Sequence, residues 1–509
     1  MIAVRRAFLA FALLSLAVPA AAAPSAAWTL KVDPWVLERL SLDGTSEMLV
    51  VLADQADLSG AAALHGKQAR GRYVFEQLTA TAKRTQTPVL DLLKQRNLPH
   101  RAYWIANMVW LRADAATVEM LAQRNDILRI SANPSVRGEI PELEPGQPSA
   151  VPTAIEASLT HVGAPTLWTA GITGGTVVVA GADTGYQWDH PALKNQYRGW
   201  NGLAASHAYN WHDAIHTTGS VCGADSAVPC DDNNHGTHTM GTMVGTDGGT
   251  NQIGMAPGAR WIGCRNMDRG NGTPTTYAEC FQFFLAPTDA TGQNPNPDLA
   301  PDVINNSWGC PVSEGCSDPL VLQTVVENVR AAGIVPVVSA GNSGSGCSTV
   351  NTPAATYDAA FSVGATDNSD VIASFSSRGT VTVDGSGRLK PDISAPGVSI
   401  RSSVRNNGYS SSSGTSMAGP HVAGLVALLI SGAPCLRGDV DAIEQLIIAT
   451  AVPRTSAQTC GGILGSDVPN AVYGHGAIRA VVPDPAAVCG LVFQDGFESG
   501  NAVRWNGTP

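Results

Sequence analysis

Three polar residues stand where an apolar segment ends or a run of small residues begins. Asp183 closes the apolar run TVVVAGAD, His235 opens the segment HGTHTMGTMVG, and Ser416 opens SMAGPHVAGLVALLI. A serine hydroxyl is a poor nucleophile near neutral pH unless a base takes its proton, and an imidazole base needs an acceptor that holds its tautomer. One serine, one histidine and one buried aspartate meet that need, so we expect these residues to perform nucleophilic catalysis together.

Ser416 follows several other hydroxyl residues, because residues 410–415 read SSSSGT. We expect a helix to begin at Ser416 and to end near Gly432 and Pro434, which suit a helix terminus. Backbone N–H groups and the positive end of the helix dipole would then adjoin this hydroxyl, which suits a developing oxyanion. The serines at 410–413 are expected to be loop residues that tolerate substitution.

Each of the three residues also has an ordinary structural explanation: a helix cap for the serine, a turn for the aspartate, and packing for the histidine. A different enzyme is a second alternative, since GTSMA nearly fits the G-x-S-x-G motif of α/β-hydrolases and Asp441 and His475 follow in the right order. That alternative leaves the segments around Asp183 and His235 unexplained. A non-catalytic binding module is a third alternative.

The segment from residue 155 to 480 has the pattern of a three-layer α/β/α domain with a mostly parallel sheet. Short β-branched runs alternate with stretches that suit helices, such as TPTTYAECFQFFLA and DPLVLQTVVENVRAAG. Ligands of such sheets gather at the carboxyl ends of the strands, where the polar residues above are found.

The N-terminal part divides into three further regions. Residues 1–23 resemble a cleaved export signal, because two arginines precede about 12 apolar residues, too few for the roughly 20 that span a bilayer. The two arginines also loosely match a twin-arginine signal, but we favour ordinary secretion. Residues 28–138 alternate strand-like and helix-like segments and predict a small α+β, ferredoxin-like domain. Residues 139–154 include four prolines and predict an exposed, cleavable linker.

The ten cysteines all follow residue 220, and their even number in an exported chain favours disulfides. No C-x-x-C pair occurs, so a metal site is disfavoured. Short loop closure suggests the pairs Cys222 with Cys230 and Cys264 with Cys280, while the other pairings stay open. We expect no membrane-spanning segment after the export signal.

The formal net charge is −11, and the acidic excess follows residue 150, where 15 basic residues accompany 28 acidic ones. An acidic body disfavours a polyanionic partner, and no basic patch with interleaved aromatic residues points to nucleic acid.

The chain resembles the subtilisin-like serine protease family between residues 155 and 480. The matching segments, in order, are VVVAGADTGYQWDHPAL, NNHGTHTMGTMVG, APGARW, PDVINNSWG, VVSAGNSG, ASFSSRG, KPDISAPGV and SSGTSMAGPHVAGLVALL. The resemblance implies a peptidase in which Asp183 orients His235, His235 acts as general base and then acid, and Ser416 attacks the peptide carbonyl.

The same resemblance implies roles for residues around the nucleophile. Asn342 would donate its side-chain N–H to the oxyanion, although a loop turn is the alternative for this residue. Ser307, Trp308 and Gly309 would pair with an extended protein substrate, together with Gly341, although Trp308 is equally suited to the core. His238 matches the second, non-catalytic histidine of its motif and is expected to be a packing residue.

No cofactor is required for this chemistry, and the structural calcium of the family is in doubt. The segment GTDGGTNQIGM after HGTH is shorter than the calcium-binding loop of the best-known members, and no D-x-[DN]-x-[DN]-G pattern occurs. A structural Ca²⁺ therefore has no assigned site in the sequence.

Residues 28–138 resemble in pattern the propeptide of this family, which acts as a folding aid and as an inhibitor until self-cleavage. A large parallel sheet has many non-local contacts and folds slowly, so a removable template would help it. We expect a secreted monomer cleaved within residues 139–154. Residues 481–509 form a short tail whose FQDGFESG resembles a segment recurrent on bacterial secreted proteins, and this resemblance implies association with a surface.

Overall fold

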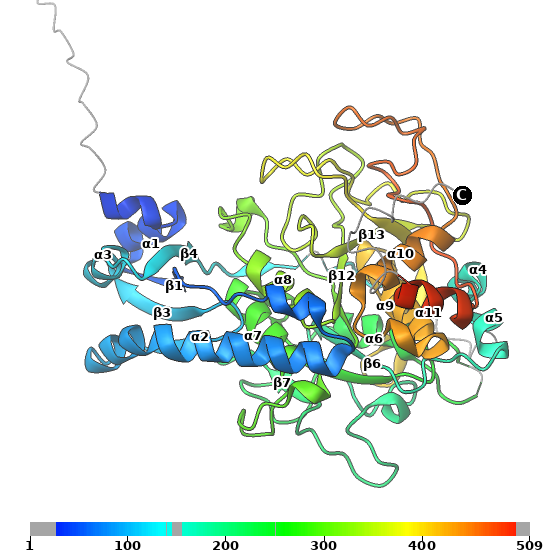
Figure 1. Cartoon of the computed structure of the whole chain (residues 1–509), viewed down its shortest axis with the longest axis horizontal. Helices are drawn as coiled ribbons and strands as arrows, with labels where there is room; N and C mark the ends of the chain where they lie inside the picture. The colour runs from blue at the N-terminus through cyan, green and yellow to red at the C-terminus, as the bar shows by residue number, and fades with distance from the viewer. Residues whose placement is uncertain (1–26, 139, 145–154, 250, 495–509) are drawn as a thin grey trace, which may run out of the picture.

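The computed structural model describes residues 27–138, 140–144, 155–249 and 251–494. The predicted export signal, most of the predicted linker and the end of the predicted tail lie outside the described residues. Figure 1 shows a smaller N-terminal domain (residues 27–138, blue and cyan) beside a larger α/β domain (residues 155–480).

A seven-stranded sheet forms the centre of the α/β domain, and its six strand pairs are all parallel. In sheet order the strands are β14 (Ile393–Pro396), β13 (Phe361–Thr366), β12 (Val335–Ser339), β11 (Val303–Asn306), β6 (Val178–Asp183), β8 (Arg260–Arg265) and β7 (Trp211–Asp213). Nearly every residue of these strands is buried, as expected for a parallel sheet covered on both faces.

Helices cover both faces of this sheet. One face packs against α4 (Ala157–Val162), α5 (Ala164–Thr169), α6 (His235–Val244), α9 (Thr415–Gly432) and α10 (Val440–Thr450). The other face packs against α7 (Pro274–Leu285) and α8 (Gln323–Ala331). Successive strand residues alternate between the two cores, since Val179 belongs to the first and Ala180 to the second. The predicted three-layer α/β/α fold is confirmed.

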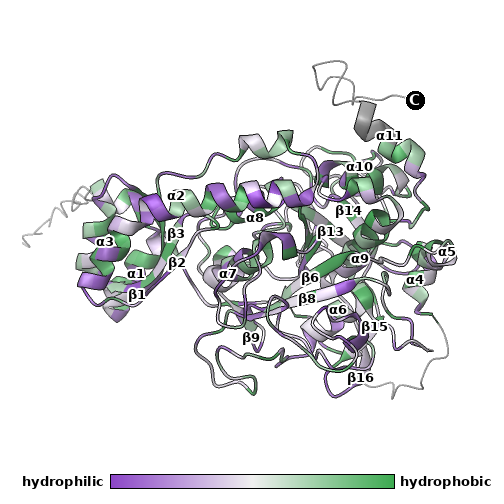
Figure 2. Cartoon of the chain, turned by 60° about the horizontal axis from the view of Figure 1, so that its bottom comes forward, coloured by the Kyte–Doolittle hydropathy of each residue, from purple (hydrophilic) through white to green (hydrophobic). Residues whose placement is uncertain are grey.

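Helix α9 runs through the first of these cores, and in Figure 2 it is mainly green, the colour of hydrophobic residues. It begins at Thr415, one residue before the predicted start, and ends at Gly432 as predicted. Among the described helices it alone is long and apolar enough to cross a membrane, yet 89% of it is buried within the protein. Such a helix is explained by the core of the α/β domain.

The N-terminal domain has a four-stranded antiparallel sheet in the order β2-β3-β1-β4. Its elements along the chain are α1 (Pro34–Asp43), β1 (Thr45–Leu52), α2 (Lys67–Gln95), β2 (His100–Tyr103), β3 (Met108–Asp114), α3 (Ala115–Ala122) and β4 (Ile127–Ala132). One set of its apolar residues forms a separate core, and another set, including Leu49 and Tyr103, joins the second core of the α/β domain. The two domains therefore share a packed interface.

Two small sheets and several short helices complete the fold. β5 (Val136–Arg137) pairs with β10 (Asn271–Gly272), which also pairs with β9 (Met267–Asp268), and β15 (Ile400–Val404) forms a hairpin with β16 (Gly408–Ser412). The 3-10 helices are η1 (Ala27–Lys31), η2 (Ser59–Ala63), η3 (Lys194–Gln196), η4 (Pro297–Leu299), η5 (Val312–Glu314) and η6 (Pro434–Leu436).

Five disulfides connect all ten cysteines. Both pairs suggested by the sequence are present, Cys222–Cys230 and Cys264–Cys280. The pairings left open are Cys310–Cys316, Cys347–Cys460 and Cys435–Cys489. The last pair attaches α11 (Pro485–Gln494), at the start of the predicted tail, to η6, so this part of the tail is fixed to the α/β domain. The N-terminal domain has no cysteine, and no disulfide therefore joins it to the α/β domain.

Candidate active site

Asp183 and His235 form a buried hydrogen-bonded pair. Asp183 is the last residue of β6 and His235 the first residue of α6, and Nδ1 of His235 lies 2.7 Å from Oδ1 of Asp183. Nε2 of His235 is buried and has no hydrogen-bond partner within the described part of the chain. With the proton on Nδ1, this Nε2 is an acceptor suited to a general base.

The charge of the pair is set by burial and by two carboxylates. Burial alone would lower the pKa of His235, but the charges of Asp183 and Asp231 raise that pKa above its ordinary value. Oδ1 of Asp183 also accepts the N–H of Thr184 at 2.7 Å, and Oδ2 accepts the hydroxyl of Thr239 at 3.2 Å. The carboxylate is therefore held in one orientation.

Glycine allows the two segments to approach each other. A Cβ at Gly236 would lie 2.1 Å from the carbonyl oxygen of Gly185 and 3.1 Å from Cβ of Asp183. The glycine that follows His235 is thus required for contact between α6 and the turn after β6.

Ser416 lies in the first turn of α9, and the residue before it is fixed by Asn342. The backbone N–H and the hydroxyl of Thr415 donate to Oδ1 of Asn342 at 2.8 and 2.9 Å. Ser416 is buried and lines one cavity with Asn342. The same cavity is lined by the other residues predicted for substrate binding: Ser307, Trp308, Gly309 and Gly341.

A second cavity, of about 280 Å³, is lined by His235, His238 and Met417, the residue after Ser416. Arg137, from the end of the N-terminal domain, lines both cavities. The predicted base and the predicted nucleophile therefore line two neighbouring cavities, both lined by Arg137, and we call the two cavities together the cleft.

That segment makes backbone pairs on both sides of the two cavities. Upstream, β5 pairs antiparallel with β10, and the N–H of Gly138 donates to the carbonyl of Gly270 at 2.8 Å. Downstream, Leu143 forms a bridge with Ser412, and the N–H of Glu144 donates to the carbonyl of Ser411 at 2.9 Å. The first described residues of the predicted linker, 140–144, thus lie along β16, and Glu142 and Leu143 are exposed.

Trp308 is both a core residue and a wall of the cavity. Its ring stacks on Tyr277 with a centroid distance of 3.8 Å and meets Phe281 edge-on, and it is 4% exposed. Trp308 is therefore packed in the core and also lines the cavity of Ser416, and its role in substrate binding stays a prediction.

His238 acts as a packing residue, as expected. Its Nε2 donates to the carbonyls of Ile400 and Ser410 at 3.0 and 3.1 Å, which joins α6 to the hairpin β15–β16. Burial and the neighbouring His235 lower the pKa of His238 to about 3, so its ring is neutral at ordinary pH.

The α/β-hydrolase alternative is not supported by the positions of its two partners. Asp441 lies on α10 with a side chain that is 85% exposed, and its carboxylate pairs with Arg330. The N–H of His475 donates to the carbonyl of Asp392, at the start of β14 rather than beside Ser416. Neither residue lines a cavity that contains Ser416.

In the loop where the sequence puts the family's calcium site in doubt, the side-chain oxygens of Asp247 and Asn251 accept hydrogen bonds from the protein. The carboxylate of Asp247 accepts the N–H groups of Gly249 and Asn251 and the side-chain amide of Asn251. Oδ1 of Asn251 accepts from the guanidinium of Arg401 at 2.9 Å, so a side-chain cation already takes that oxygen. Among the residues that the structure describes, no group of three or more His, Cys, Asp or Glu could hold a metal ion.

Sequence reasoning missed Asp231, whose buried carboxylate contacts both sequence motifs of the site. The available signal was the acidic pair Asp231-Asp232 just before the segment NNHGTH. An acidic pair in a polar loop is ordinarily a solvated turn, so only the fold distinguishes this residue.

Comparisons of the sequence with known proteins match most of the chain. The model of the subtilase family matches residues 174–476. Bacillopeptidase F of Bacillus subtilis (strain 168) is 37% identical over 437 residues, which are 82% of this chain and 29% of that protein. Subtilisin DY of Bacillus licheniformis is 36% identical over 238 residues, which are 46% of this chain and 76% of that protein. Subtilisin of Bacillus pumilus is 31% identical over 290 residues, which are 55% of this chain and 86% of that protein. The chain thus spans less than a third of the length of Bacillopeptidase F.

Proposed function

The chain belongs to the subtilase family of subtilisin-like serine proteases, and we propose that it is a secreted serine endopeptidase made as a self-processed precursor. The observation that carries the proposal is the hydrogen bond between Asp183 and His235, on a cleft that also contains Ser416 and Asn342. Its substrates are proteins and peptides, which the cleft accepts in an extended conformation.

The reaction proceeds through an acyl-enzyme. Nε2 of His235 takes the proton of the Ser416 hydroxyl as the oxygen attacks the peptide carbonyl, and Asp183 holds the ring and stabilises the imidazolium. His235 then gives this proton to the leaving amine. A water molecule, activated by His235 in the same way, hydrolyses the ester and releases Ser416.

The oxyanion of each tetrahedral intermediate is stabilised by Asn342 and by the first turn of α9. Because Thr415 binds the carboxamide oxygen of Asn342 twice, the NH₂ end of that carboxamide is the donor we assign to the oxyanion. The N–H groups at the start of an 18-residue helix add a favourable positive potential beside Ser416.

Binding of the substrate upstream of the cleaved bond follows the path of β5. An extended peptide in that place forms antiparallel backbone pairs with β10, as Val136 and Arg137 do. The side chain of Val136 is fully buried against the disulfide Cys310–Cys316, which indicates an apolar subsite there.

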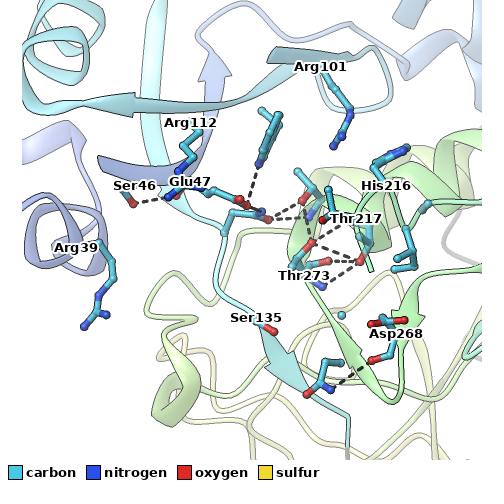
Figure 3. Close-up of a pocket in the computed structure, with 18 of the residues that line it drawn as sticks. Arg39, Ser46, Glu47, Arg101, Arg112, Ser135, His216, Thr217, Asp268 and Thr273 are labelled. Atoms are coloured by element: carbon cyan, nitrogen blue, oxygen red, sulfur yellow. Dashed lines mark hydrogen bonds between the residues drawn. The ribbon is translucent and has the colours of Figure 1, made fainter. Parts of the chain in front are cut away.

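Residues 28–138 are proposed to be the propeptide and an intramolecular inhibitor, because the segment that ends this domain occupies the cleft. Its interface with the α/β domain combines a shared apolar core with specific polar contacts: the Tyr103 hydroxyl donates to Glu279 at 2.8 Å, and Lys67 pairs with Asp302 at 3.0 Å. A cavity of about 670 Å³ lies between the two domains, with Arg39, Glu47 and Arg101 on one side and His216 and Asp268 on the other (Figure 3). The cavity leaves part of this interface unpacked, which supports release after cleavage.

Processing is proposed to begin near residues 138–140, at the start of the predicted linker, because Gly138 and Ile140 line the cavity that contains His235. Removal of residues 1–23 during export would precede this step. Residues 495–509 are proposed as the part of the tail that associates with a surface.

The proposal is tested with Ser416→Ala and, as a matched control, Ser411→Ala in the same serine run. The control should hydrolyse casein and react with a serine-directed fluorophosphonate, and its N-terminal domain should be cleaved off. Ser416→Ala should do none of these. If Ser416→Ala still hydrolyses casein, the serine assignment is wrong, and if wild type neither hydrolyses protein nor reacts with the probe, the chain is a non-catalytic binding module.

A further inference from the structure

The carboxylate of Asp231 lies between the segments that carry Asp183 and His235. It is 4% exposed and accepts five hydrogen bonds. Oδ1 accepts the hydroxyl of Thr184 at 2.9 Å and the N–H groups of Asn233 and Asn234 at 2.9 and 3.0 Å. Oδ2 accepts the N–H and the hydroxyl of Thr237 at 3.1 and 2.6 Å.

Thr184 connects this carboxylate to both partners of the buried pair. Its N–H donates to Asp183 at 2.7 Å, and its hydroxyl accepts the N–H of Gly236, the residue after His235, at 3.0 Å. The same hydroxyl donates to Asp231. Without Asp231, Thr184 would lose the acceptor of its hydroxyl, and the contact between the start of α6 and the end of β6 would be weakened.

Asp231 also takes the place of the helix cap of α6. The N-cap residue, Asn234, has a positive φ of 118° and no side-chain cap bond, and its carboxamide oxygen instead accepts the N–H of Arg405. The positive end of a helix disfavours a cation, and the proposed base is the first residue of α6. A carboxylate that binds the N–H groups of Asn234 and Thr237 opposes this field at the imidazole.

We propose that Asp231 is a positioning residue of the reaction: it holds α6 against β6 so that His235 stays aligned with Asp183, and its negative charge favours the imidazolium. This inference rests on the proposed function for its consequence in catalysis, but its effect on His235 can be measured without catalysis. The upward pKa shift of His235, to which Asp231 contributes, has the expected sign.

Asp183 and Asp231 are the charges that raise the pKa of His235, although other titratable and charged groups lie near it. His238 on α6 is neutral, and burial together with both carboxylates raises the pKa of Tyr186 far above its ordinary value, so it stays protonated. Arg137, Glu142 and Arg269 line the cavity beside His235. Removal of the Asp231 charge should therefore lower the pKa of His235.

The first test measures the titration of His235 by NMR of histidine-labelled full-length precursor carrying Ser416→Ala. In this background Asp231→Asn should lower the midpoint of His235 by about 0.5 to 1 unit. The control Asp189→Asn removes an exposed carboxylate from the same part of the chain and should leave the midpoint unchanged. An unshifted midpoint in folded Asp231→Asn would overturn the inference.

The second test measures peptide hydrolysis by the processed enzyme. Asp231→Asn should lower kcat by about tenfold or more at unchanged KM and move the acid limb of kcat/KM to lower pH. Thr184→Val breaks the link to α6 but keeps the charge, so it should lower kcat without moving the acid limb. A merely structural role would change the melting temperature and leave the acid limb in place, which contradicts the inference.

If Asp231→Asn does not fold, the inference is tested with Thr184→Val alone. A kcat of Thr184→Val within twofold of the wild-type value would then overturn the inference. The outcomes separate this inference from the proposed function. An active wild type with an unshifted His235 midpoint in Asp231→Asn rejects the role of Asp231 alone. A wild type whose Ser416 is unreactive rejects the proposed function, and the NMR titration still shows whether Asp231 sets the charge of His235.

Discussion

The backbone N–H of Arg137 donates to the carboxylate of Glu314 at 2.9 Å, and this bond ties the end of the N-terminal domain to the loop closed by Cys310–Cys316. The same loop buries Val136, and a Cβ at Gly315 would lie 2.5 Å from Nε1 of Trp35. The disulfide joins two cysteines only six residues apart and so closes a short loop directly after Ser307–Gly309. The surface of this loop is small and rigid. Whatever peptide occupies the place of β5 must contact that surface.

We predict that the double variant Cys310→Ser/Cys316→Ser discriminates long from short substrates. Opening the loop removes the wall that buries Val136, so kcat/KM should fall about tenfold for peptides that extend several residues upstream of the cleaved bond. Short chromogenic substrates, which do not reach the loop, should be hydrolysed as by wild type. The matched control is Cys435→Ser/Cys489→Ser, which opens the disulfide at α11, and equal losses in both variants would show a general effect on stability.

Asp183→Asn should keep the fold and lose most of the activity. The amide is isosteric, but it favours the wrong imidazole tautomer and does not stabilise the imidazolium, and a loss of about 10⁴ in kcat is expected from this mechanism. Because Thr184 N–H and the Thr239 hydroxyl also bind this side chain, the melting temperature should change little. Steady-state kinetics and calorimetry check both statements, and a variant with more than a tenth of wild-type kcat would contradict the assignment.

Asn342→Ala should lower kcat by about 10²–10³ with KM unchanged, because a donor to the oxyanion acts in the transition state. The variant also removes the acceptor for the N–H and hydroxyl of Thr415, so the start of α9 loses two hydrogen bonds. Asn342→Asp keeps an acceptor for Thr415 and removes the donor, and it separates the two effects. If Asn342→Asp retained wild-type kcat, the oxyanion role would be excluded.

Acid should destabilise the protein through its buried neutral histidines. Burial lowers the pKa of His421 to about 4 and that of His238 to about 3, below the ordinary value of about 6.5. The unfolded state therefore binds more protons as the pH falls below about 6.5, and stability is lost from there down to the folded pKa values. Each histidine contributes up to about 1.4 kcal/mol per pH unit to this slope.

The test compares melting temperatures of Ser416→Ala precursor between pH 7 and 4.5. His421→Gln should flatten the pH dependence, since glutamine can still donate to the carbonyl of Met417 and accept from Ser158 but does not titrate. His65→Asn, at an exposed position, should leave the pH dependence as in wild type. An unchanged slope in His421→Gln would show that other groups govern the acid transition.

The sequence predicts most of the fold because its strands are apolar runs that end at polar or glycine residues, as at Asp183, and such local patterns do not depend on distant contacts. The start of α9 was predicted one residue late, because the N–H of Thr415 is held by Asn342, 73 residues away. Asp231 was missed for a related reason: its partner Thr184 is 47 residues away. The pairing of Cys347 with Cys460 spans 113 residues and likewise depends on the folded chain.

The interface between the two domains yields a final prediction about inhibition, which rests on the proposed role of residues 28–138. Lys67, at the start of α2, pairs with Asp302 with side-chain exposures of only 11% and 5%, and Asp302 also receives the N–H of Val178. Lys67→Met keeps the apolar stem but leaves a buried carboxylate with Arg437 as its remaining cation, so the cleaved N-terminal domain should dissociate about tenfold more readily. Arg72→Met removes an ion pair with Asp298 in which the arginine is 57% exposed, and this matched control should change dissociation by less than about threefold. The rate at which peptidase activity recovers after self-cleavage measures this dissociation in each variant. Equal rates in the two variants would mean that the buried ion pair of Lys67 does not hold the domains together.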